Sequence, residues 1–374
     1  MRSGERSGRL QLVRGDGHAA LPVIRWLAVA LLFAATGHVS AACVETLVPA
    51  FVRDLTAAKD FTYANDLAWL PNGKLLIGGR DGVTEYSLAD ETSRRVVSGD
   101  AVPDGLPMVQ ALDTDGATLV AFNSDYGDMA FDVAKKRVLR ARRRPAFQMF
   151  DLAVRGRTVA VLGRPLLVKG AGYGALWIGE VGAPWETFRL LRESDRTSEE
   201  LLRNTLPPYG GGIVFTSDGT LAMITASEVG VARYRPDGTA LPSLGTELDA
   251  LVIRGLPEIA KRYRTDFRGR YEGVLNRQPL ADDLIETNDG LAIVVRQWAT
   301  GVVTWELWFP DAKTTRRRVR LASDRRPTGG HMRCDAQGGK VACLFDRYVA
   351  ANQSNRPHLA VYDLAQAKRD PKCR

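Results

Sequence analysis

The feature that most constrains this chain is a unit that recurs six times along it. The first copy spans residues 65–88, NDLAWLPNGKLLIGGRDGVTEYSL. It holds an apolar segment, an Asn-Gly turn, a second apolar segment, and a third segment that begins at glycine and alternates apolar with polar residues. Asn-Gly between apolar runs is a strong hairpin signal, because a type I′ turn needs positive φ at both central residues. The unit therefore predicts three antiparallel strands.

The same order of segments returns downstream in residues 109–137, 151–182, 212–238, 283–313 and 332–366. Successive turn glycines are separated by 43, 40, 63, 71 and 49 residues, and they are Gly73, Gly116, Gly156, Gly219, Gly290 and Gly339. A period near 40 matches a four-stranded propeller blade, and longer gaps mark insertions. The sequence thus predicts an all-β fold, a six-bladed β-propeller.

The largest gap predicts a small helical insertion between blades 4 and 5, at about residues 241–282. Within it, residues 245–275 place apolar residues at helical spacing, and Pro257 predicts a break into two helices. The basic and aromatic run formed by Lys261, Arg262, Tyr263 and Arg264 suits a partner-binding surface. The alternative is a helix packed on the side of the propeller.

The first 42 residues have the pattern of an export signal. A basic beginning is followed by the apolar run WLAVALLFAATG at 26–37 and by small residues before Cys43. The run is shorter than the roughly 20 residues of a membrane-spanning helix, which disfavours the alternative of an uncleaved anchor. We therefore expect a signal peptide at 1–42, a propeller domain at 43–374 with no transmembrane segment, and a periplasmic or secreted location.

Four cysteines follow the predicted signal, and an even number in an exported chain indicates disulfides. Cys334 and Cys343 flank a strand–turn–strand pattern, whereas Cys43 and Cys373 stand at the two ends of the mature chain. Blade 6 lacks an outermost strand in the sequence, and the apolar segment 44–52 could supply it as a closing strand. We expect the pairs Cys43–Cys373 and Cys334–Cys343, because metal ligation would need a C-x-x-C spacing that is missing.

The repeat resembles that of six-bladed β-propellers in the NHL-repeat, TolB-like and SMP-30/gluconolactonase-like group. The similarity covers residues 44–373 and consists of a strand, a Pro/Asp-x-Gly turn with GKL, a second strand, and a third strand starting near glycine. This architecture hosts lactonases, lyases and binding modules, so the resemblance implies the fold more than the activity.

Three aspartates stand where inner strands of alternate blades begin: Asp66, Asp151 and Asp283. Carboxylates that converge on a channel repel one another unless a cation or a shared proton intervenes, and oxygen-rich clusters suit Ca²⁺ or Mg²⁺. They therefore form a candidate metal site, completed by Asn65 or Gln110. The alternative is that each aspartate shapes its own turn. In the lactonase-like family a glutamate joins the ligands, and the blade 1 position here holds none.

His331 precedes the sixth inner strand and is a candidate catalytic residue at the same channel mouth. Two arginine runs, 140–144 and 316–320, fit either anion binding or the charged edge strands that discourage aggregation. Without residues 1–42 the chain holds 46 basic and 41 acidic residues, a net charge of +5, which argues against a nucleic-acid partner.

The leading functional hypothesis is an exported, monomeric propeller that binds a small molecule or an envelope protein. The alternative is a metal-dependent hydrolase or lactonase-like enzyme with its site at the channel mouth.

Overall fold

The structure is a computed structural model of the 374-residue chain. The chain divides into two units, residues 1–42 and residues 43–374, and the fold below is that of the second unit. The described residues are 43–55, 61, 64–80, 82–98, 108–123, 127–135, 137–142, 147–165, 176–193, 211–225, 229–252, 278–299, 302–323, 332–345 and 357–368. The predicted signal peptide lies outside them.

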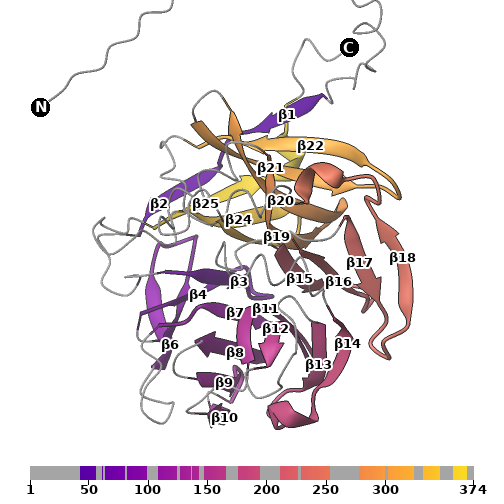
Figure 1. Ribbon diagram of the computed structural model, residues 1–374. Helices are drawn as coiled ribbons and strands as arrows, with labels where there is room; N and C mark the ends of the chain where they lie inside the picture. The colour runs from indigo at the N-terminus through magenta and orange to yellow at the C-terminus, as the bar shows by residue number, and fades with distance from the viewer. Residues whose placement is uncertain are drawn as a thin grey trace, which may run out of the picture. The chain divides into compact units, whose positions relative to one another are not determined.

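The described residues form six sheets, the blades of a β-propeller, as predicted (Figure 1). Blade 1 contains β3 (Asp66–Trp69), β4 (Leu75–Gly79), β5 (Gly82–Tyr86) and β6 (Ser93–Ser98). Blade 2 contains β7 (Ala111–Thr114), β8 (Thr118–Asn123), β9 (Gly127–Asp132) and β10 (Arg137–Arg142). Blade 3 contains β11 (Phe147–Arg155), β12 (Thr158–Pro165), β13 (Leu176–Glu180) and β14 (Arg189–Arg192), with the 3-10 turn η3 (Trp185–Thr187) before β14.

The second half of the ring follows the same plan. Blade 4 contains β15 (Gly211–Phe215), β16 (Leu221–Thr225), β17 (Val231–Tyr234) and β18 (Ala240–Leu244). Blade 5 contains β19 (Leu280–Thr287), β20 (Gly290–Ala299), β21 (Val302–Pro310) and β22 (Thr315–Leu321). Blade 6 contains β23 (Arg333–Gln337), β24 (Lys340–Phe345) and β25 (His358–Asp363), followed by the 3-10 turn η5 (Leu364–Gln366).

The first strand of each blade lies toward the centre of the ring, as Figure 1 shows for β3, β7, β11, β15 and β19. The turn after each inner strand contains the glycine by which the repeat was recognised. All six have positive φ: 78° at Gly73, 90° at Gly116, 58° at Gly156, 86° at Gly219, 102° at Gly290 and 80° at Gly339. Residues with a side chain rarely adopt this conformation, which explains why glycine marks the period.

The N-terminal segment joins two blades. β2 (Phe51–Asp54) pairs antiparallel with β25 and supplies the fourth strand of blade 6, whereas β1 (Val44–Leu47) pairs in parallel with β22 and adds a fifth strand to blade 5. The segment 44–52, expected as one closing strand, is therefore divided between neighbouring blades. Pro49 lies in the link between the two strands, where the missing N–H of proline breaks no ladder.

The two ends of the domain also meet. Thr46 on β1 exchanges both backbone hydrogen bonds with Lys368, at 2.9 and 3.0 Å. Cys43 is disulfide-bonded. Its expected partner Cys373 lies outside the described residues, so the Cys43–Cys373 pair stays a prediction.

The hydrophobic core consists of clusters that each lie between two adjacent blades. Alternate residues of a strand point to opposite faces, so each blade contributes to the cluster on either side of it. Blades 5 and 6, for example, share Leu47, Trp305 and Phe345. Burial of these faces is what holds consecutive blades against one another.

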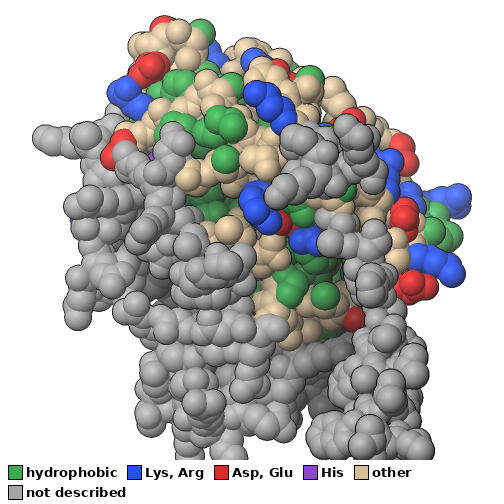
Figure 2. All heavy atoms as spheres, turned by 90° about the horizontal axis from the view of Figure 1, so that it is seen from above, with side chains coloured by type: hydrophobic (Ala, Val, Ile, Leu, Met, Phe, Trp, Pro, Cys, Tyr) green, Lys and Arg blue, Asp and Glu red, His purple; other side chains and the backbone are tan. Residues whose placement is uncertain are grey.

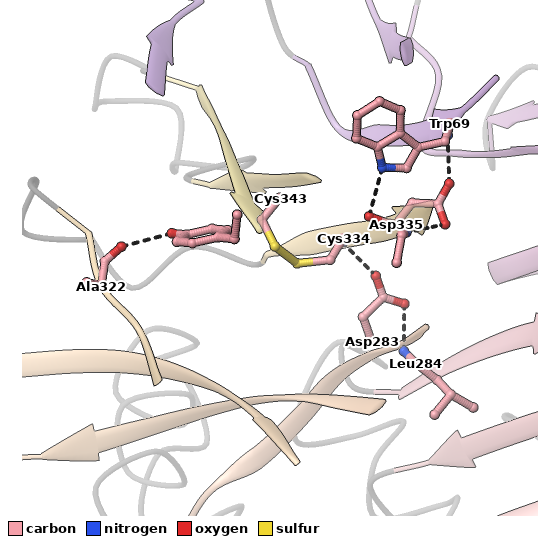
Figure 3. Close-up of a disulfide and its surroundings, with 9 residues drawn as sticks. Trp69, Asp283, Leu284, Ala322, Cys334, Asp335 and Cys343 are labelled. Carbon is pink, nitrogen blue, oxygen red and sulfur yellow. Dashed lines mark hydrogen bonds between the residues drawn. A yellow bond between two sulfur atoms is a disulfide. The ribbon is translucent and has the colours of Figure 1, made fainter. Parts of the chain in front are cut away.

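Cys334 and Cys343 are directly opposed on β23 and β24 and form the predicted disulfide (Figure 3). The predicted helices between blades 4 and 5 are not shown. The described part of that connection contains one 3-10 turn, η4 (Asp249–Leu251), and residues 253–277 lie outside it. No helix in the described part of the chain has the length and apolar character needed to cross a bilayer.

Candidate functional site

The three aspartates of the predicted metal site share one structural role. Each lies near the start of the inner strand of an odd-numbered blade and accepts a hydrogen bond from a backbone N–H of the next blade's inner strand. The bonds join Asp66 Oδ2 to Leu112 N at 2.9 Å, Asp151 Oδ2 to Ile213 N at 2.9 Å, and Asp283 Oδ2 to Cys334 N at 3.0 Å (Figure 3). These carboxylates thus connect neighbouring blades at the centre of the ring.

Two further aspartates do the same in even-numbered blades, two positions later along the strand. Asp113 of blade 2 accepts from Val154 N, and Asp335 of blade 6 accepts from Trp69 N, both at 2.6 Å. Figure 3 shows Asp335 also accepting from the Trp69 indole through its carbonyl oxygen, at 3.1 Å. Sequence reasoning missed this pair because it compared only the first position of each inner strand.

Gly212 stands at the aspartate position of blade 4. A Cβ atom there would lie 2.4 Å from Leu284 N and 2.6 Å from Asp283 Oδ1, so no side chain fits. Blades 4 and 5 are instead connected further along, where the Ser217 N–H donates to Glu286 at 2.7 Å. Glycine at this position allows close approach of two inner strands.

The cation that lies among the three predicted metal ligands is the guanidinium of an arginine. Arg333, at the start of the blade 6 inner strand, donates through Nη1 to Asp283 Oδ1 at 3.0 Å, and the same nitrogen lies 3.3 Å from Asp151 Oδ2. Its Nη2 donates to the Phe150 carbonyl at 2.8 Å. The guanidinium therefore reaches from blade 6 to blades 5 and 3 while it is only 7% exposed. Arg333 therefore lies across the centre of the ring.

The electrostatics of this cluster follow from burial and mutual repulsion. Burial raises the pKa of Asp151 to about 7, with Arg333 lowering it and Asp283 and Asp66 raising it further. Burial likewise raises the pKa of Asp283. For Arg333, burial lowers the pKa, but the three aspartates outweigh that effect and hold it above its ordinary value. The guanidinium is thus permanently charged, whereas its partners can share protons.

The two aspartates further along the inner strands, Asp113 and Asp335, have raised pKa values for the same reason. Burial raises the pKa of Asp335 to about 6, and it raises the pKa of Asp113 well above its ordinary value, helped by the charge of Asp335. We name this set of five aspartates and Arg333 the central cluster. Its carboxylates outnumber its one guanidinium, so full ionisation of the set is opposed by repulsion.

The oxygens of the three predicted metal ligands already accept hydrogen bonds within the protein. The Asp66, Asp151 and Asp283 oxygens accept from backbone N–H groups and Arg333, and Asn65 Nδ2 donates to the Val109 carbonyl at 3.1 Å. Gln110 donates its backbone N–H to Phe122. Among the described residues, no group of three or more His, Cys, Asp or Glu side chains is arranged to hold a metal. The Ca²⁺ or Mg²⁺ site stays a prediction that these contacts do not support.

A second buried charge pair lies beside this cluster in blade 5. Arg296 Nη2 lies 2.9 Å from Asp282 Oδ1, and both side chains are fully buried. Burial raises the pKa of Asp282 to about 8 and lowers the pKa of Arg296 to about 9. Trp305 and Phe345 pack edge to face nearby, and His358 stacks on Phe345. No sequence signal distinguished this pair from exposed charges.

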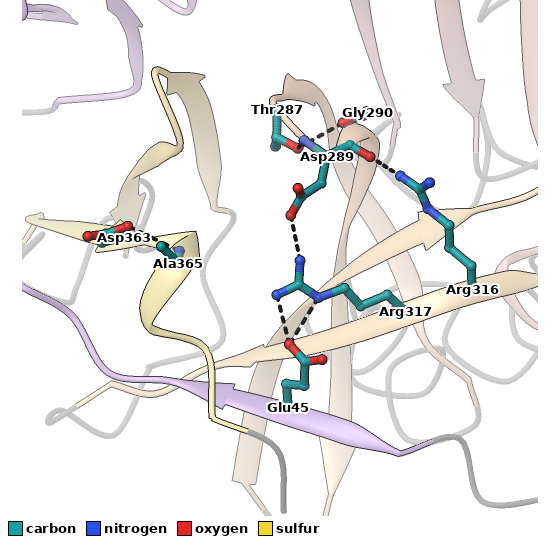
Figure 4. Close-up of polar contacts among 8 residues, drawn as sticks. All are labelled: Glu45, Thr287, Asp289, Gly290, Arg316, Arg317, Asp363 and Ala365. Carbon is teal, nitrogen blue, oxygen red and sulfur yellow. Dashed lines mark hydrogen bonds and ion pairs between the residues drawn. The ribbon is translucent and has the colours of Figure 1, made fainter.

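The arginine run 316–320 is used inside the fold rather than for anion binding. Figure 4 shows Arg317 donating to Glu45 of β1 through Nε at 2.9 Å and Nη2 at 2.7 Å, and pairing with Asp289. Arg318 and Arg320 both pair with the fully buried Glu306. The strand was expected at a sheet edge, but β1 covers it.

Other predicted site residues lie outside the described part of the chain. These are His331, the candidate catalytic residue, and the run Lys261, Arg262, Tyr263 and Arg264. On the face shown in Figure 2, basic side chains lie among acidic and apolar ones and do not form one continuous patch.

No protein-family profile and no curated protein matches this sequence. Solved structures share the fold. The calcium-binding protein regucalcin from Agrobacterium tumefaciens is 12% identical, with a TM-score of 0.51 over 85% of this chain and 96% of that one. A presumed exported protein of Bacteroides fragilis is 11% identical, with a TM-score of 0.50 over 84% of this chain and 98% of that one. At such identities the similarity defines the class, a six-bladed β-propeller, and nothing narrower.

Proposed function

We propose that this protein is an exported β-propeller that binds a small molecule or an envelope protein, and that it is not a metal-dependent hydrolase. The observation that carries the proposal is the position of Arg333. A hydrolytic metal at the channel mouth needs carboxylate oxygens that are free to coordinate it. Here the Arg333 guanidinium already pairs with Asp151 and Asp283, and backbone N–H groups donate to both carboxylates.

Export is supported by two features. The segment before Cys43 has the sequence pattern of a signal peptide. The Cys334–Cys343 disulfide also fits an oxidising compartment, since structural disulfides are rare in the cytosol of most organisms.

The arrangement of turns indicates which face of the propeller would bind. The turns after the inner strands are tied to one another from blade to blade: Asp115 accepts from Gly156 N at 2.6 Å, and Arg155 donates to the Ser217 carbonyl at 2.8 Å. The opposite face, where the inner strands begin, receives the longer connections, including the one between β18 and β19. Loops carried by a rigid scaffold commonly hold binding residues. The proposal therefore places the ligand on that face and makes Lys261–Arg264 a candidate contact.

Metal analysis of the processed protein, purified from the host envelope, separates the two functions. We expect no stoichiometric metal and no rise in Tm when Ca²⁺ or Mg²⁺ is added after chelation. A ligand present at 100 times its Kd would stabilise the fold by about 2.7 kcal/mol, which a thermal melt detects. A saturable rise that is lost in Asp66→Asn and Asp283→Asn would restore the hydrolase hypothesis.

Partner capture tests the binding function itself. We expect envelope extracts to yield a partner that full-length protein retains and that a variant lacking residues 245–275 does not. The deletion could also abolish capture by unfolding the protein. Substitution of Lys261 and Arg264 by Glu changes the same surface in the full-length chain, and it is the matched control for that effect. If neither change affects capture, the insertion is not the partner surface.

A further inference from the structure

The outer strands of the blades differ in what happens at their free edges. β22 is covered by β1, and β14 is tied to blade 4 because Arg189 donates to the carbonyls of Pro236 and Asp237. β18 contains Pro242, which protects an edge because it offers no N–H. The outer strand of blade 1, β6, packs Val97 into the core, where the residue is 3% exposed.

β10, the outer strand of blade 2, has none of these protections. Its backbone pairs with β9 on one side, and no strand of the described chain pairs with its other edge. It exposes two consecutive apolar side chains, Val138 at 36% and Leu139 at 45%. Neither β6, β14 nor β18 exposes a large apolar side chain. A bulge between Val138 and Arg140 is the only interruption of its ladder.

The strand is also strongly basic. Its sequence, RVLRAR, contributes three arginines and no acidic residue. Arg137 is exposed, and it lies opposite Asp132 of β9, the carboxylate that pairs with Lys135 at 3.5 Å. A basic strand with exposed apolar residues and an open backbone edge complements an extended segment that is acidic and apolar.

The same chain shows how such an edge is filled. β22, TRRRVRL, resembles β10 in its mixture of arginine and aliphatic residues, and β1, VETL, lies along it. Glu45 of β1 accepts two hydrogen bonds from Arg317, and Leu47 of β1 is fully buried in the core between blades 5 and 6. Where β1 adds to this basic blade edge, it contributes one glutamate that meets an arginine and one leucine that enters the core, two residues apart on the same face of the strand.

We propose that β10 is a docking strand for an acidic, extended segment of a partner protein, which adds to blade 2 as β1 adds to blade 5. Backbone hydrogen bonds along the edge would supply affinity, and Arg137 with Val138 and Leu139 would select glutamate or aspartate alternating with apolar residues. The inference rests on the proposed binding function and names the chemistry of a partner for it. It uses the outer edge of blade 2, whereas the insertion tested above connects blades 4 and 5 along the chain.

The test uses the processed full-length protein and a fluorescein-labelled peptide of alternating Glu and Val, followed by anisotropy. We expect saturable binding that weakens as salt rises, because the charges are exposed. The double substitution Arg137→Glu/Val138→Glu should weaken binding by about tenfold or more. The matched control is Arg157→Glu/Val229→Glu, which changes one exposed arginine and one exposed valine elsewhere and should leave binding unchanged.

Several results would overturn the inference. A peptide of alternating Lys and Val that binds as well as the acidic one would remove the charge argument, and one of alternating Glu and Ser would remove the apolar argument. Binding to anionic vesicles but not to the peptide would make β10 a lipid-facing surface. A dimer that the Arg137→Glu/Val138→Glu variant dissociates would make the occupant a second copy. If the peptide fails while partner capture through residues 245–275 succeeds, the docking strand is wrong and the binding function stands.

Discussion

Arg333 on the inner strand of blade 6 places its Nη1 atom 3.3 Å from Oδ2 of Asp151 on blade 3. The two strands belong to opposite sides of a six-membered ring, so this contact crosses the central axis. A side chain that ties opposite blades together has a different energetic role from a surface ion pair, because both charges are buried and each depends on the other.

The first prediction follows from that dependence. Arg333→Met leaves Asp151 and Asp283 without their cation, and we expect the free energy of unfolding to fall by roughly 3–5 kcal/mol. Urea denaturation monitored by tryptophan fluorescence measures the change. Arg157→Met, which removes the exposed pair with Glu180, is the control and should change stability little. A loss as small as that of the control would mean that the central cluster is not stabilising.

The second prediction concerns pH. Burial raises the pKa of Asp151 from 3.8 to about 7 in the folded protein. Between these values the folded chain holds a proton that the unfolded chain has released, so the free energy of unfolding should fall as pH rises from about 4 to about 7. Asp151→Asn, which stays neutral, should flatten the slope. Urea midpoints at pH 5, 6, 7 and 8 test this, and an unchanged slope in the variant would contradict it.

The third prediction concerns the blade 4–5 junction. Gly212→Ala places a Cβ atom 2.4 Å from Leu284 N, and we expect a loss of about 1–3 kcal/mol from overpacking. Gly73→Asn is the control: its φ is 78°, but no atom lies within 4 Å of the added Cβ. Asparagine tolerates that conformation, so the control should lose less than about 1 kcal/mol. Equal effects would show that the contact with blade 5 is not what requires glycine.

The fourth prediction concerns β1. Glu45→Ala removes both hydrogen bonds from Arg317, and we expect a loss of about 1 kcal/mol together with faster tryptic cleavage after Arg53, the first trypsin site beyond β1. Limited trypsin digestion followed by mass spectrometry measures the second effect. Glu247→Ala removes an exposed pair with Lys313 without removing a lysine or arginine, and it should leave the digestion pattern unchanged. Identical digestion of both variants would show that Glu45 does not hold β1.

The fifth prediction concerns the disulfides. Digestion without reduction should yield the peptide pair Cys334–Cys343 and, if the two ends are linked as the sequence predicts, the pair Cys43–Cys373. The first bond closes a loop with a sequence separation of 9, so Cys334→Ser/Cys343→Ser should cost roughly 2–3 kcal/mol in the chain-entropy model. Free thiols in the unreduced protein would contradict both pairings.

The sequence predicted the ring well because the signal for each blade is local. The turn after β3 has positive φ at Gly73 but not at Asn72, so it is not the predicted type I′ turn, yet its need for glycine is visible without knowing where the blade sits. The Cys334–Cys343 bond was predictable for the same reason, since both residues belong to one hairpin. The ring period, the inner strands and one disulfide therefore follow from local pattern.

Only part of the central cluster could be predicted from the sequence. Asp66, Asp151 and Asp283 share a position in their repeats, so their convergence could be inferred. Their cation could not, because Arg333 meets Phe150 and Asp151 across more than 180 residues of sequence and carries no local signal. The parallel pairing of β1 with β22 was missed for a related reason, since its partner is 274 residues away at Val44 and Arg318.

The division of the N-terminal segment between β1 and β2 has a consequence for biosynthesis. Blade 6 cannot be completed until β25 has been made, and blade 5 keeps an open edge unless the first strand of the domain reaches it. β1 and β2 can therefore pair only after β22 and β25 have been synthesised, and closing so long a loop is slow. During synthesis and any translocation, the ring stays open, and its two ends become ordered together only when the chain is whole.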